Sequence, residues 1–327
     1  MTAPGNGQLV ALTGATGFIG THLSVALVAA GYRVRALVRP VSASKPLARS
    51  VERIPGDLSD AGDLARLLEN ADTIIHCAGA VRGAREADFM RINKDATEVL
   101  VASAQAARVR RFILVSSLAA RHPGVSPYAA SKRAGEAALQ RLAHGTSFVA
   151  LRPPAVYGKG DRELMPLFAT LNRGLAPVWG DPEARFSLIH VDDLVRAILS
   201  CVQCDPEFSS AYELHDGRPN GYSMNEVIAI VEQWAGRRIR RFPVPSRLLD
   251  LLAGMNLRCA RAFGYSPMLT PWKLRELRHP RWVCDNKPFS AMTGWNPEIT
   301  LAEGLPLVLG DNPDPDGSPI EDNDEHS

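Results

Sequence analysis

Short hydrophobic runs alternate with longer amphipathic segments through the first half of the chain. Runs of this length, bounded by turn residues, are typical of strands buried in a parallel sheet, and the segments between them have the periodicity of helices. We expect six strands, at 9–12, 34–38, 51–54, 73–77, 112–115 and 148–151. We expect helices at 19–30, 63–69, 93–107 and 128–142. The alternation predicts an α/β fold with a doubly wound parallel sheet, whose ligands bind at the carboxyl ends of the strands.

The strict alternation ends after Arg152, where prolines interrupt shorter elements. We therefore expect residues 1–155 to form the sheet domain, and residues 156–309 to form mainly a smaller, interleaved substrate-binding part. The strand-then-helix pattern at 186–203 is expected to return to the main sheet. The amphipathic segment Ser246–Phe263 is expected to be a helix that covers the substrate, in preference to one that lies on a membrane.

Composition and charge narrow the class of protein. The chain has 327 residues, of which 46% are hydrophobic and 22% charged, and no apolar stretch reaches the length of a membrane-spanning helix. We expect a cytoplasmic protein without stable membrane insertion. The formal net charge of +2 combines an acidic tail at 310–327, expected to be disordered, with a basic remainder. Its arginines are spread over many elements, which argues against a nucleic-acid partner and favours an anionic cofactor.

The cysteines give no sign of a metal site. The five cysteines are scattered and odd in number, so we expect reduced thiols. Cys201 and Cys204 form a C-x-x-C pair, but the pair lies late in an apolar, helix-like run and away from any strand-to-helix turn. We interpret the pair as part of the core.

A glycine-rich turn follows the first predicted strand. The first glycine permits a tight turn, the second lets backbone approach a pyrophosphate, and the third lets the helix pack closely on the strand. The order of strand, turn and helix predicts a dinucleotide site of the Rossmann type, with the phosphates at the helix N-terminus. The cofactor contacts expected in this turn are Gly14, Thr16, Gly17, Phe18, Ile19 and Gly20.

The end of the second predicted strand indicates which dinucleotide binds. An acidic residue there accepts a hydrogen bond from the ribose 2′-hydroxyl of NAD, whereas an arginine accommodates the 2′-phosphate of NADP. The chain has Arg39 at this place and no acidic residue before Glu52. We therefore expect NADP in preference to NAD. The alternative is that Arg39 is solvated and that backbone contacts the ribose.

Tyr128 and Lys132 are four residues apart, which places them on one face of the helix that Pro127 introduces. A tyrosine has a pKa of about 10, so it is a poor acid or base at neutral pH unless a neighbouring cation stabilises the phenolate. Lys132 is expected to supply that cation and to bind the nicotinamide ribose. Ser117, after the fifth predicted strand, would hold the substrate oxygen against the phenol.

These residues, together with further motifs, resemble the extended short-chain dehydrogenase/reductase family over roughly residues 8–309. The further motifs are Gly56-Asp57-Leu58, His76-Cys77-Ala78-Gly79, Asn93 and the runs 152–158 and 190–193. The resemblance implies that Asp57 and Leu58 lie at the adenine and that Ala78 and Gly79 lie along the cofactor. It places Pro153 and Val156 near the nicotinamide, and gives Asn93 a structural role or a part in a water relay.

Two of these residues also have simpler interpretations from the sequence alone. Asp57 could cap the helix that follows it. His190 is interpreted as a structural histidine at the end of a strand, because a lone histidine without a partner of known geometry is weak support for catalysis.

The resemblance also favours one branch of the family. Leu118 stands where sugar dehydratases carry an acidic residue, Ala155 stands where nucleotide-sugar enzymes usually carry asparagine, and Arg185 is displaced by one position from their arginine. The pattern resembles the dihydroflavonol-reductase and 3β-hydroxysteroid-dehydrogenase branch. That branch implies hydride transfer between NADP(H) and a secondary alcohol or ketone on an apolar small molecule. The alternatives are a nucleotide-sugar epimerase with tightly bound NAD and a cofactor-binding subunit without activity. A homodimer through two helices, one of them the Tyr128 helix, is a family expectation.

Overall fold

The computed structural model describes residues 5, 7–204 and 208–310. Its main sheet contains β1 (Leu9–Thr13), β2 (Arg33–Val38), β3 (Glu52–Pro55), β4 (Thr73–His76), β5 (Arg111–Val115), β6 (Ser147–Arg152) and β11 (Ser209–Glu213). These seven strands have the order β11-β6-β5-β4-β1-β2-β3, and all neighbours are parallel. The chain order reverses between β1 and β4, which is where such sheets bind ligands. The predicted doubly wound sheet is confirmed.

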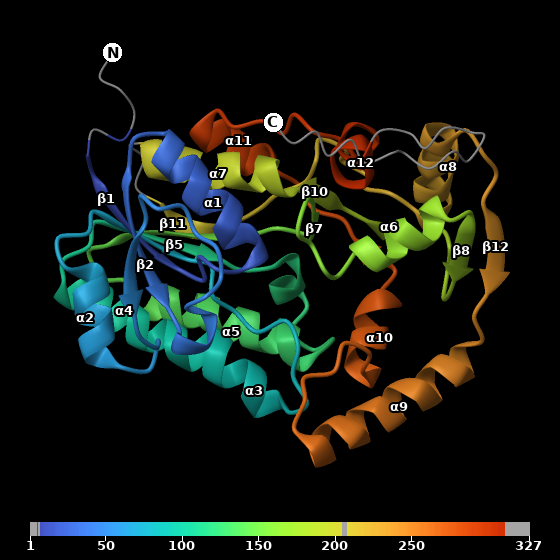
Figure 1. The fold of residues 1–327 in the computed structure, drawn as a ribbon, viewed down its shortest axis with the longest axis horizontal. Coiled ribbons are helices and arrows are strands. Elements are labelled where there is room, and N and C mark those ends of the chain that lie inside the picture. Colours follow the sequence, from blue (N-terminus) through green and yellow to red (C-terminus); the bar gives the residue numbers. More distant parts are fainter. Residues whose placement is uncertain (1–4, 6, 205–207, 311–327) are drawn as a thin grey trace, which may run out of the picture.

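Helices cover both faces of the main sheet (Figure 1). One face carries α1 (Phe18–Ala29), α7 (Val191–Gln203) and α11 (Lys287–Thr293). The other carries α2 (Ala61–Leu68), α3 (Glu86–Met90), α4 (Ala96–Ala106) and α5 (Pro127–Leu142), with a π-helical turn, Arg91–Asp95, between α3 and α4. Val10 and Leu12 of β1 enter the first core, whereas Leu9 and Ala11 enter the second. Burial on both faces explains why the strands read as hydrophobic runs.

A smaller part of the molecule lies beyond the carboxyl edge of the main sheet (Figure 1). Its helices are α6 (Met165–Asn172), α8 (Met224–Ala235), α9 (Ser246–Phe263), α10 (Pro271–Leu277) and α12 (Leu301–Leu309). Three two-stranded parallel sheets join β7 (Ala155–Tyr157) to β10 (Leu188–His190), β8 (Leu175–Val178) to β12 (Arg240–Pro243), and β9 (Arg185–Phe186) to β13 (Arg281–Trp282). Tyr157, Phe168 and Tyr222 belong to a separate core.

The segment 186–203 returns to the main sheet only through its helix. Leu194 and Ile198 of α7 pack in the first core, but the strand before them, β10, pairs with β7 outside the main sheet. The expectation that this strand joins the main sheet is therefore wrong. The seventh strand is β11, which pairs with β6 at the edge of the sheet. Its sequence has no hydrophobic run, because an edge strand has less surface to bury.

Three further expectations concern the amphipathic segment, membrane-spanning helices and the acidic tail. The amphipathic segment forms α9 with the predicted bounds. No helix in the described ranges is long and apolar enough to cross a membrane. The acidic tail expected at 310–327 lies outside the described residues apart from Gly310.

Candidate active site

The residues predicted to bind the cofactor gather along one edge of the main sheet. They follow successive strands: the turn 14–20 after β1, Arg39 after β2, Asp57 and Leu58 after β3, Ala78 and Gly79 after β4, Ser117 after β5 and Pro153 after β6. Because these strands are parallel, their carboxyl ends share this edge. Val156 lies in β7, and Tyr128 and Lys132 lie on α5. The residues predicted from the sequence therefore lie where a cofactor bound along this edge would contact them.

The turn between β1 and α1 has no space for a side chain at Gly14 or Gly20. Gly14 has a φ of +74°, which glycine adopts at little cost. A Cβ on Gly14 would lie 2.5 Å from the amide nitrogen of Ala78, and a Cβ on Gly20 would overlap the carbonyl oxygen of Gly14. Gly17 precedes α1, whose first N–H groups have no acceptor within the helix. These features fit a dinucleotide whose phosphates accept hydrogen bonds from the start of α1.

Asp57, at the end of β3, has Ser59 as its hydrogen-bond partner. The hydroxyl and amide of Ser59 donate hydrogen bonds to the Asp57 carboxylate at 2.7 and 3.0 Å. These bonds, and more weakly the charges of Arg39 and Arg91, lower the pKa of Asp57. Asp57 does not cap α2, because Asp60 accepts the capping hydrogen bond. That alternative interpretation is wrong.

Lys132 is buried beside the loop that follows β4. Its Nζ atom donates to the carbonyl oxygen of Val115 at 2.9 Å and would lie 3.2 Å from a Cβ on Gly79. The side chain of Asn93 fixes the same loop, because it donates to the Ala80 carbonyl at 2.9 Å and accepts from the Ala80 amide at 2.8 Å. Asn93 lies in the π-helical turn, a kind of irregularity that often occurs at functional sites. These contacts account for Asn93 as a structural residue.

Tyr128 lies in the first turn of α5, where two neighbours orient its phenol. The side chain of Ser117 lies next to the phenol and interacts with it. The ring of Phe89, from α3, packs edge-on at 6.3 Å between ring centroids. The Ser117 hydroxyl also caps the short turn that follows β5, so its position is set by backbone.

The phenol of Tyr128 is held in its protonated form. Burial raises its pKa to about 12, the hydrogen bond to Ser117 acts in the opposite direction, and the charges of Glu276 and Glu163 raise it further. The expected lowering by Lys132 is not found, because its ammonium group is directed at the Val115 carbonyl instead. A tyrosine in this state keeps its proton at neutral pH, and the raised pKa makes it a weaker acid than a free tyrosine.

Glu136 holds α5 against the strand ends, and the sequence analysis missed it. Arg152 donates to its two carboxylate oxygens at 2.9 and 2.6 Å, and the hydroxyl of Ser116 donates at 2.5 Å. Glu136 is only 6% exposed. It lies four residues after Lys132 and eight after Tyr128, so it shares their helix face. That spacing is the signal that could have identified it.

A pocket lies beside the phenol of Tyr128. Its apolar lining consists of Val81, Phe89, Pro267, Met268 and Trp272. Its charged lining consists of Arg82, Glu163, Lys273 and Glu276. The walls thus come from the loop after β4, from α3 and α5, from the segment before α6, and from α10 with the stretch that leads to it.

The segment 267–276 covers the pocket, and α9 does not. Ser126, the N-cap of α5, donates a hydrogen bond to the carboxylate of Glu276 in α10, which ties this cover to the helix that carries Tyr128 and Lys132. Leu257 and Ala260 of α9 lie behind the cover, where they pack with Ala84 and Trp272. The expectation that α9 covers the substrate is therefore wrong, because the covering residues belong to 267–276. The helix α10 lies over Tyr128 although more than one hundred residues separate the two in the sequence.

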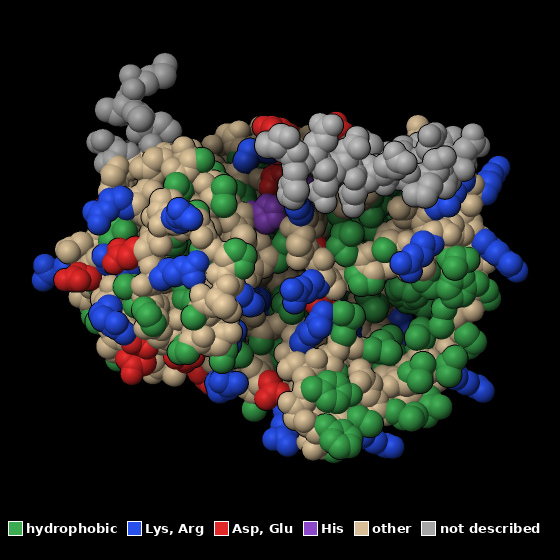
Figure 2. Space-filling model, in the orientation of Figure 1, with side chains coloured by type: hydrophobic (Ala, Val, Ile, Leu, Met, Phe, Trp, Pro, Cys, Tyr) green, Lys and Arg blue, Asp and Glu red, His purple; other side chains and the backbone are tan. Residues whose placement is uncertain are grey.

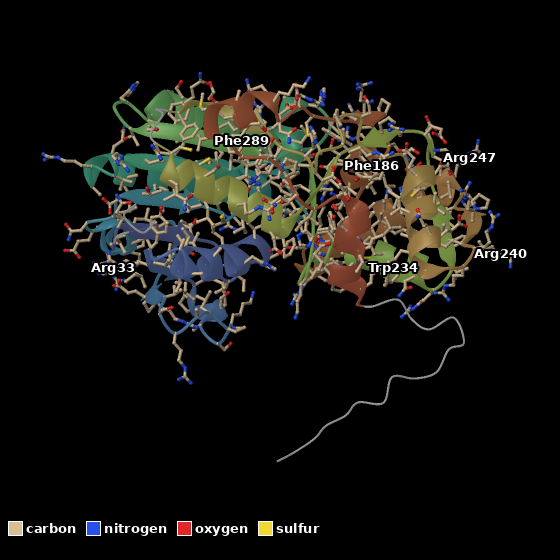
Figure 3. The ribbon with its side chains drawn as sticks, turned by 90° about the horizontal axis from the view of Figure 1, so that it is seen from above. Arg33, Phe186, Trp234, Arg240, Arg247 and Phe289 are labelled. Atoms are coloured by element: carbon tan, nitrogen blue, oxygen red, sulfur yellow. The ribbon has the colours of Figure 1, made fainter. Side chains whose placement is uncertain are left out.

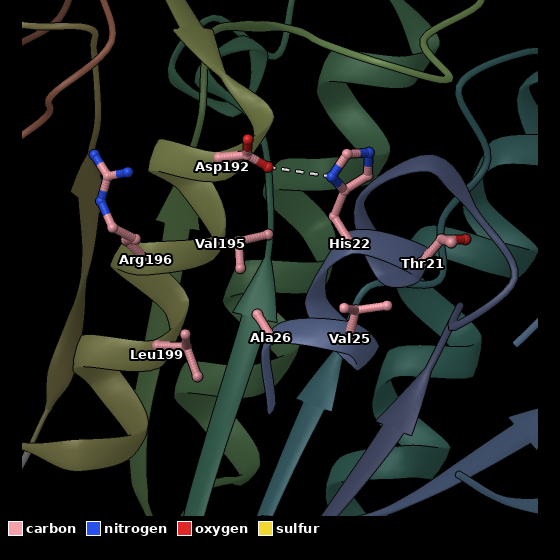
Figure 4. A pocket seen from close by; sticks show the side chains of 8 residues that line it. All are labelled: Thr21, His22, Val25, Ala26, Asp192, Val195, Arg196 and Leu199. Carbon is pink, nitrogen blue, oxygen red and sulfur yellow. Dashed lines mark hydrogen bonds and ion pairs between the residues drawn. The ribbon is translucent and has the colours of Figure 1, made fainter. Parts of the chain in front are cut away.

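A second hollow lies between α1 and α7 and holds none of the predicted site residues (Figure 4). His22 lines it and hydrogen-bonds Asp192 at 3.2 Å. Nearby, His190 caps α7 by accepting from the Asp192 amide at 3.3 Å, and its ring packs on Tyr157. These contacts agree with the structural interpretation of His190.

The cysteine pair belongs to the core, as interpreted from the sequence. Cys201 is fully buried in the first core, and both Cys201 and Cys204 are free thiols. Within the described ranges, no group of three or more His, Cys, Asp and Glu side chains could hold a metal ion.

Comparisons with known proteins match this chain along most of its length. The model of the NAD dependent epimerase/dehydratase family matches residues 10–209. A ceramide reductase of Caulobacter vibrioides is 37% identical over 308 residues, which cover 92% of this chain and 90% of the relative. A 3 beta-hydroxysteroid dehydrogenase/Delta 5→4-isomerase of Mycobacterium tuberculosis is 27% identical over 80% of this chain and 86% of its own. The solved structure of MoeE5 in complex with UDP-glucose and NAD has a TM-score of 0.72 at 25% identity, over 92% of this chain and 97% of that chain.

Proposed function

This chain belongs to the NAD dependent epimerase/dehydratase family, and on that premise we propose that it is an NADP(H)-dependent reductase that converts a ketone into a secondary alcohol on a long, apolar molecule. The family and the relatives indicate an enzyme that uses a nicotinamide cofactor. The expected branch agrees with relatives that include a reductase and a 3 beta-hydroxysteroid dehydrogenase.

The observation that carries the proposal is a protonated tyrosine beside a pocket that has both apolar and charged walls. The side chains of Val81, Pro267 and Met268 can make apolar contacts with the hydrocarbon part of a substrate. A sugar would instead need many hydrogen-bonding groups in the pocket. Burial keeps the Tyr128 phenol protonated, so the proton that a carbonyl oxygen must gain is in place, although the raised pKa makes the phenol a weaker acid than free tyrosine. The similarity to a ceramide reductase, an enzyme named for an apolar lipid, supports the same substrate class.

The residues divide the work as follows. The turn 14–20 would hold the diphosphate of the cofactor, and Lys132 would bind the ribose next to the nicotinamide. The reduced nicotinamide supplies the hydride that the carbonyl carbon accepts. Ser117 donates a hydrogen bond that orients the ketone oxygen, and Tyr128 transfers its phenolic proton to that oxygen. The products are the alcohol and a phenolate, which regains its proton from solvent.

Nucleotide-sugar epimerisation is less well supported. In this chain Arg185 donates to the carbonyl oxygens of Asn220 and Gly221 at 2.9 and 3.1 Å, and pairs with Glu226 at 3.2 Å. These partners engage the guanidinium group of Arg185, so it is not available to bind a diphosphate. Ala155, where an asparagine would be expected, has no hydrogen-bonding side chain.

The preference for NADP can be tested at Arg39. We expect Arg39→Ala to weaken NADPH binding by about tenfold to a hundredfold and to leave NADH binding nearly unchanged, because a charge-assisted contact to the 2′-phosphate is lost. Titration of cofactor fluorescence measures both dissociation constants. Arg33→Ala, an exposed arginine at the opposite end of β2, is the matched control. Tighter binding of NADH by the wild type, with no effect of Arg39→Ala, would reverse the cofactor assignment.

Lys132 gives the reductase a pH dependence. Burial lowers its pKa to about 8, while the interactions with Cys77 and with the Glu136 carboxylate act in the opposite direction. The ammonium group is present below this pKa and lost as the pH rises through it, so kcat/KM should fall above pH of about 8. Glu136→Gln removes a negative charge that raises the pKa of Lys132, so the fall should move to lower pH. Initial rates of NADPH oxidation across the alkaline range measure the shift.

A matched variant separates this effect from a general loss of surface charge. Glu98→Gln removes a carboxylate that pairs with Lys94 and Arg141, and it should retain the wild-type profile. Identical profiles for the wild type and Glu136→Gln would show that the ammonium group of Lys132 does not govern the rate.

The proposed reaction itself is tested with a panel of substrates. Purified protein and NADPH are incubated with long-chain ketones, steroid ketones and UDP-glucose. We expect one NADPH to be consumed for each alcohol formed from an apolar ketone, and none with UDP-glucose. Epimerisation of the sugar without net change in the nicotinamide would favour the epimerase.

A further inference from the structure

The outer face of α9 leaves a strip of large hydrophobic side chains in solvent. Its residues lie three, four, seven and fifteen positions after the first of them, which places them along one side of the helix. We call these residues the α9 strip: Leu248, Leu251, Leu252, Met255 and Phe263, with exposed fractions of 47, 60, 44, 52 and 80%. The opposite side of α9 is already packed, through Ala253, Leu257 and Ala260. The helix therefore has one apolar side inside the molecule and a second one without a cover among the described residues.

Arginines concentrate around the α9 strip. Residues 237–282 contain eleven Lys and Arg and only two acidic residues. Both acidic residues already have partners, because Asp250 pairs with Arg278 and Glu276 with Lys273. The exposed members of the set are Arg237, Arg238, Arg240, Arg241, Arg247, Arg258, Arg261, Arg275 and Arg281. Within the described part of the chain, none of these exposed arginines forms an ion pair.

The two features occupy one region of the surface. Figure 2 shows hydrophobic side chains gathered over the part of this face where Figure 1 draws β8, β12 and α9, with Lys and Arg side chains around them. Phe242 of β12, Leu175 of β8 and Tyr265 after α9 are also exposed there. Figure 3 places Arg240 and Arg247 together at one end of the molecule, far from Arg33 at the other.

We propose that the α9 strip and its arginines dock this protein reversibly on an anionic lipid surface. Leucine, methionine and phenylalanine side chains enter the boundary between headgroups and acyl chains, and arginines at that depth meet lipid phosphates. A second copy of this chain is a poorer occupant, because the same face would bring arginines against arginines. A nucleic acid would use the arginines and leave the leucines in water. Docking is peripheral, since no described helix can span a membrane.

Docking would place the pocket close to the membrane. The inner side of α9 packs on Trp272, and Trp272 lines the pocket beside Tyr128 together with Met268. A long apolar ketone would then move between the bilayer and the pocket over a short path that is shielded from water. This second step rests on the proposed function, whereas the docking itself does not.

The test is cosedimentation of the full-length protein with lipid vesicles. One set of vesicles contains phosphatidylglycerol and phosphatidylcholine in equal parts, and the other contains phosphatidylcholine alone. We expect binding to the first set, weaker binding to the second, and loss of binding as salt is added, because each arginine near an anionic surface contributes about fivefold in affinity.

Two pairs of variants locate the contact. Leu251→Ser with Met255→Ser should lower the partition coefficient by about tenfold or more, whereas Leu307→Ser, which alters an equally exposed leucine (59%) on α12, should not. Arg247→Glu with Arg258→Glu should abolish binding, whereas Arg33→Glu should not. Reduction of a short, water-soluble ketone should be equal in all these variants. The vesicle result can be interpreted even if the protein proves not to reduce ketones.

Three outcomes would overturn the proposal. The first is no binding to anionic vesicles at any salt concentration. The second is equal binding by the wild type and the Leu251→Ser, Met255→Ser variant. The third is a dimer in analytical ultracentrifugation that the same two substitutions dissociate, which would assign the α9 strip to a second copy of the chain.

Discussion

Tyr128→Phe should lower kcat for ketone reduction by about a hundredfold to ten-thousandfold, because the substituted ring cannot donate a proton. The ring of phenylalanine keeps the edge-on contact with Phe89, so the pocket should keep its shape. NADPH binding should change little, since the glycine turn and Lys132 are untouched. Steady-state kinetics give kcat, and titration with NADPH gives the dissociation constant.

A matched substitution guards against a general effect of losing a hydroxyl. Tyr212→Phe removes a phenol that bonds the sulfur of Met292, away from the pocket, and should keep wild-type turnover. Wild-type turnover in Tyr128→Phe would refute Tyr128 as the proton donor. Equal and negligible activity in the wild type and Tyr128→Phe would favour the cofactor-binding subunit without activity.

Gly20→Ala should destabilise the fold by about 3 kcal/mol or more and abolish NADPH binding, because the added Cβ overlaps backbone that has no room to move. The overlap is with the carbonyl oxygen of Gly14 and, at 2.8 Å, with the Cα atom of Ala15. Both atoms belong to the turn that would carry the cofactor. Urea unfolding and cofactor titration measure the two effects.

A second helical glycine provides the control. Gly254 lies inside α9, and a Cβ there would meet nothing within 4 Å. Gly254→Ala should leave NADPH binding unchanged and stabilise the protein by up to about 1 kcal/mol, since alanine favours helix. Normal stability and NADPH binding in Gly20→Ala would mean that the β1–α1 turn does not hold the cofactor in the proposed way.

The fold was predictable where burial dominates the sequence. Strands such as β1 and β5 are covered on both faces, so nearly every residue is apolar and the hydrophobic run marks the strand. The edge strand β11 and the short helix α3 have no such run, and neither was predicted. The segment 186–190 was misplaced because buried residues in β10 have the same pattern as those of the main sheet, and sequence does not tell which partner strand they meet.

The candidate site shows the same division between local and distant signals. The turn 14–20 and the pair of Ser117 and Tyr128 were predictable, because each depends on a local motif next to a strand end. The hydrogen bond from Ser126 to Glu276 joins residues 150 positions apart, and no local sequence pattern predicts it. The direction of the Lys132 ammonium group depends on the Val115 carbonyl, so its weak influence on the Tyr128 phenol emerged only from the structure.

The central claim is that this protein transfers a hydride from added NADPH to an apolar ketone. Its most direct test uses NADPH deuterated at the transferred position, a long-chain ketone and mass spectrometry of the product. We predict one deuterium at the carbinol carbon of the alcohol, formed in equal amount to the NADPH consumed, and none with Tyr128→Phe. An unlabelled product, or turnover of UDP-glucose by cofactor that remains bound, would contradict the claim.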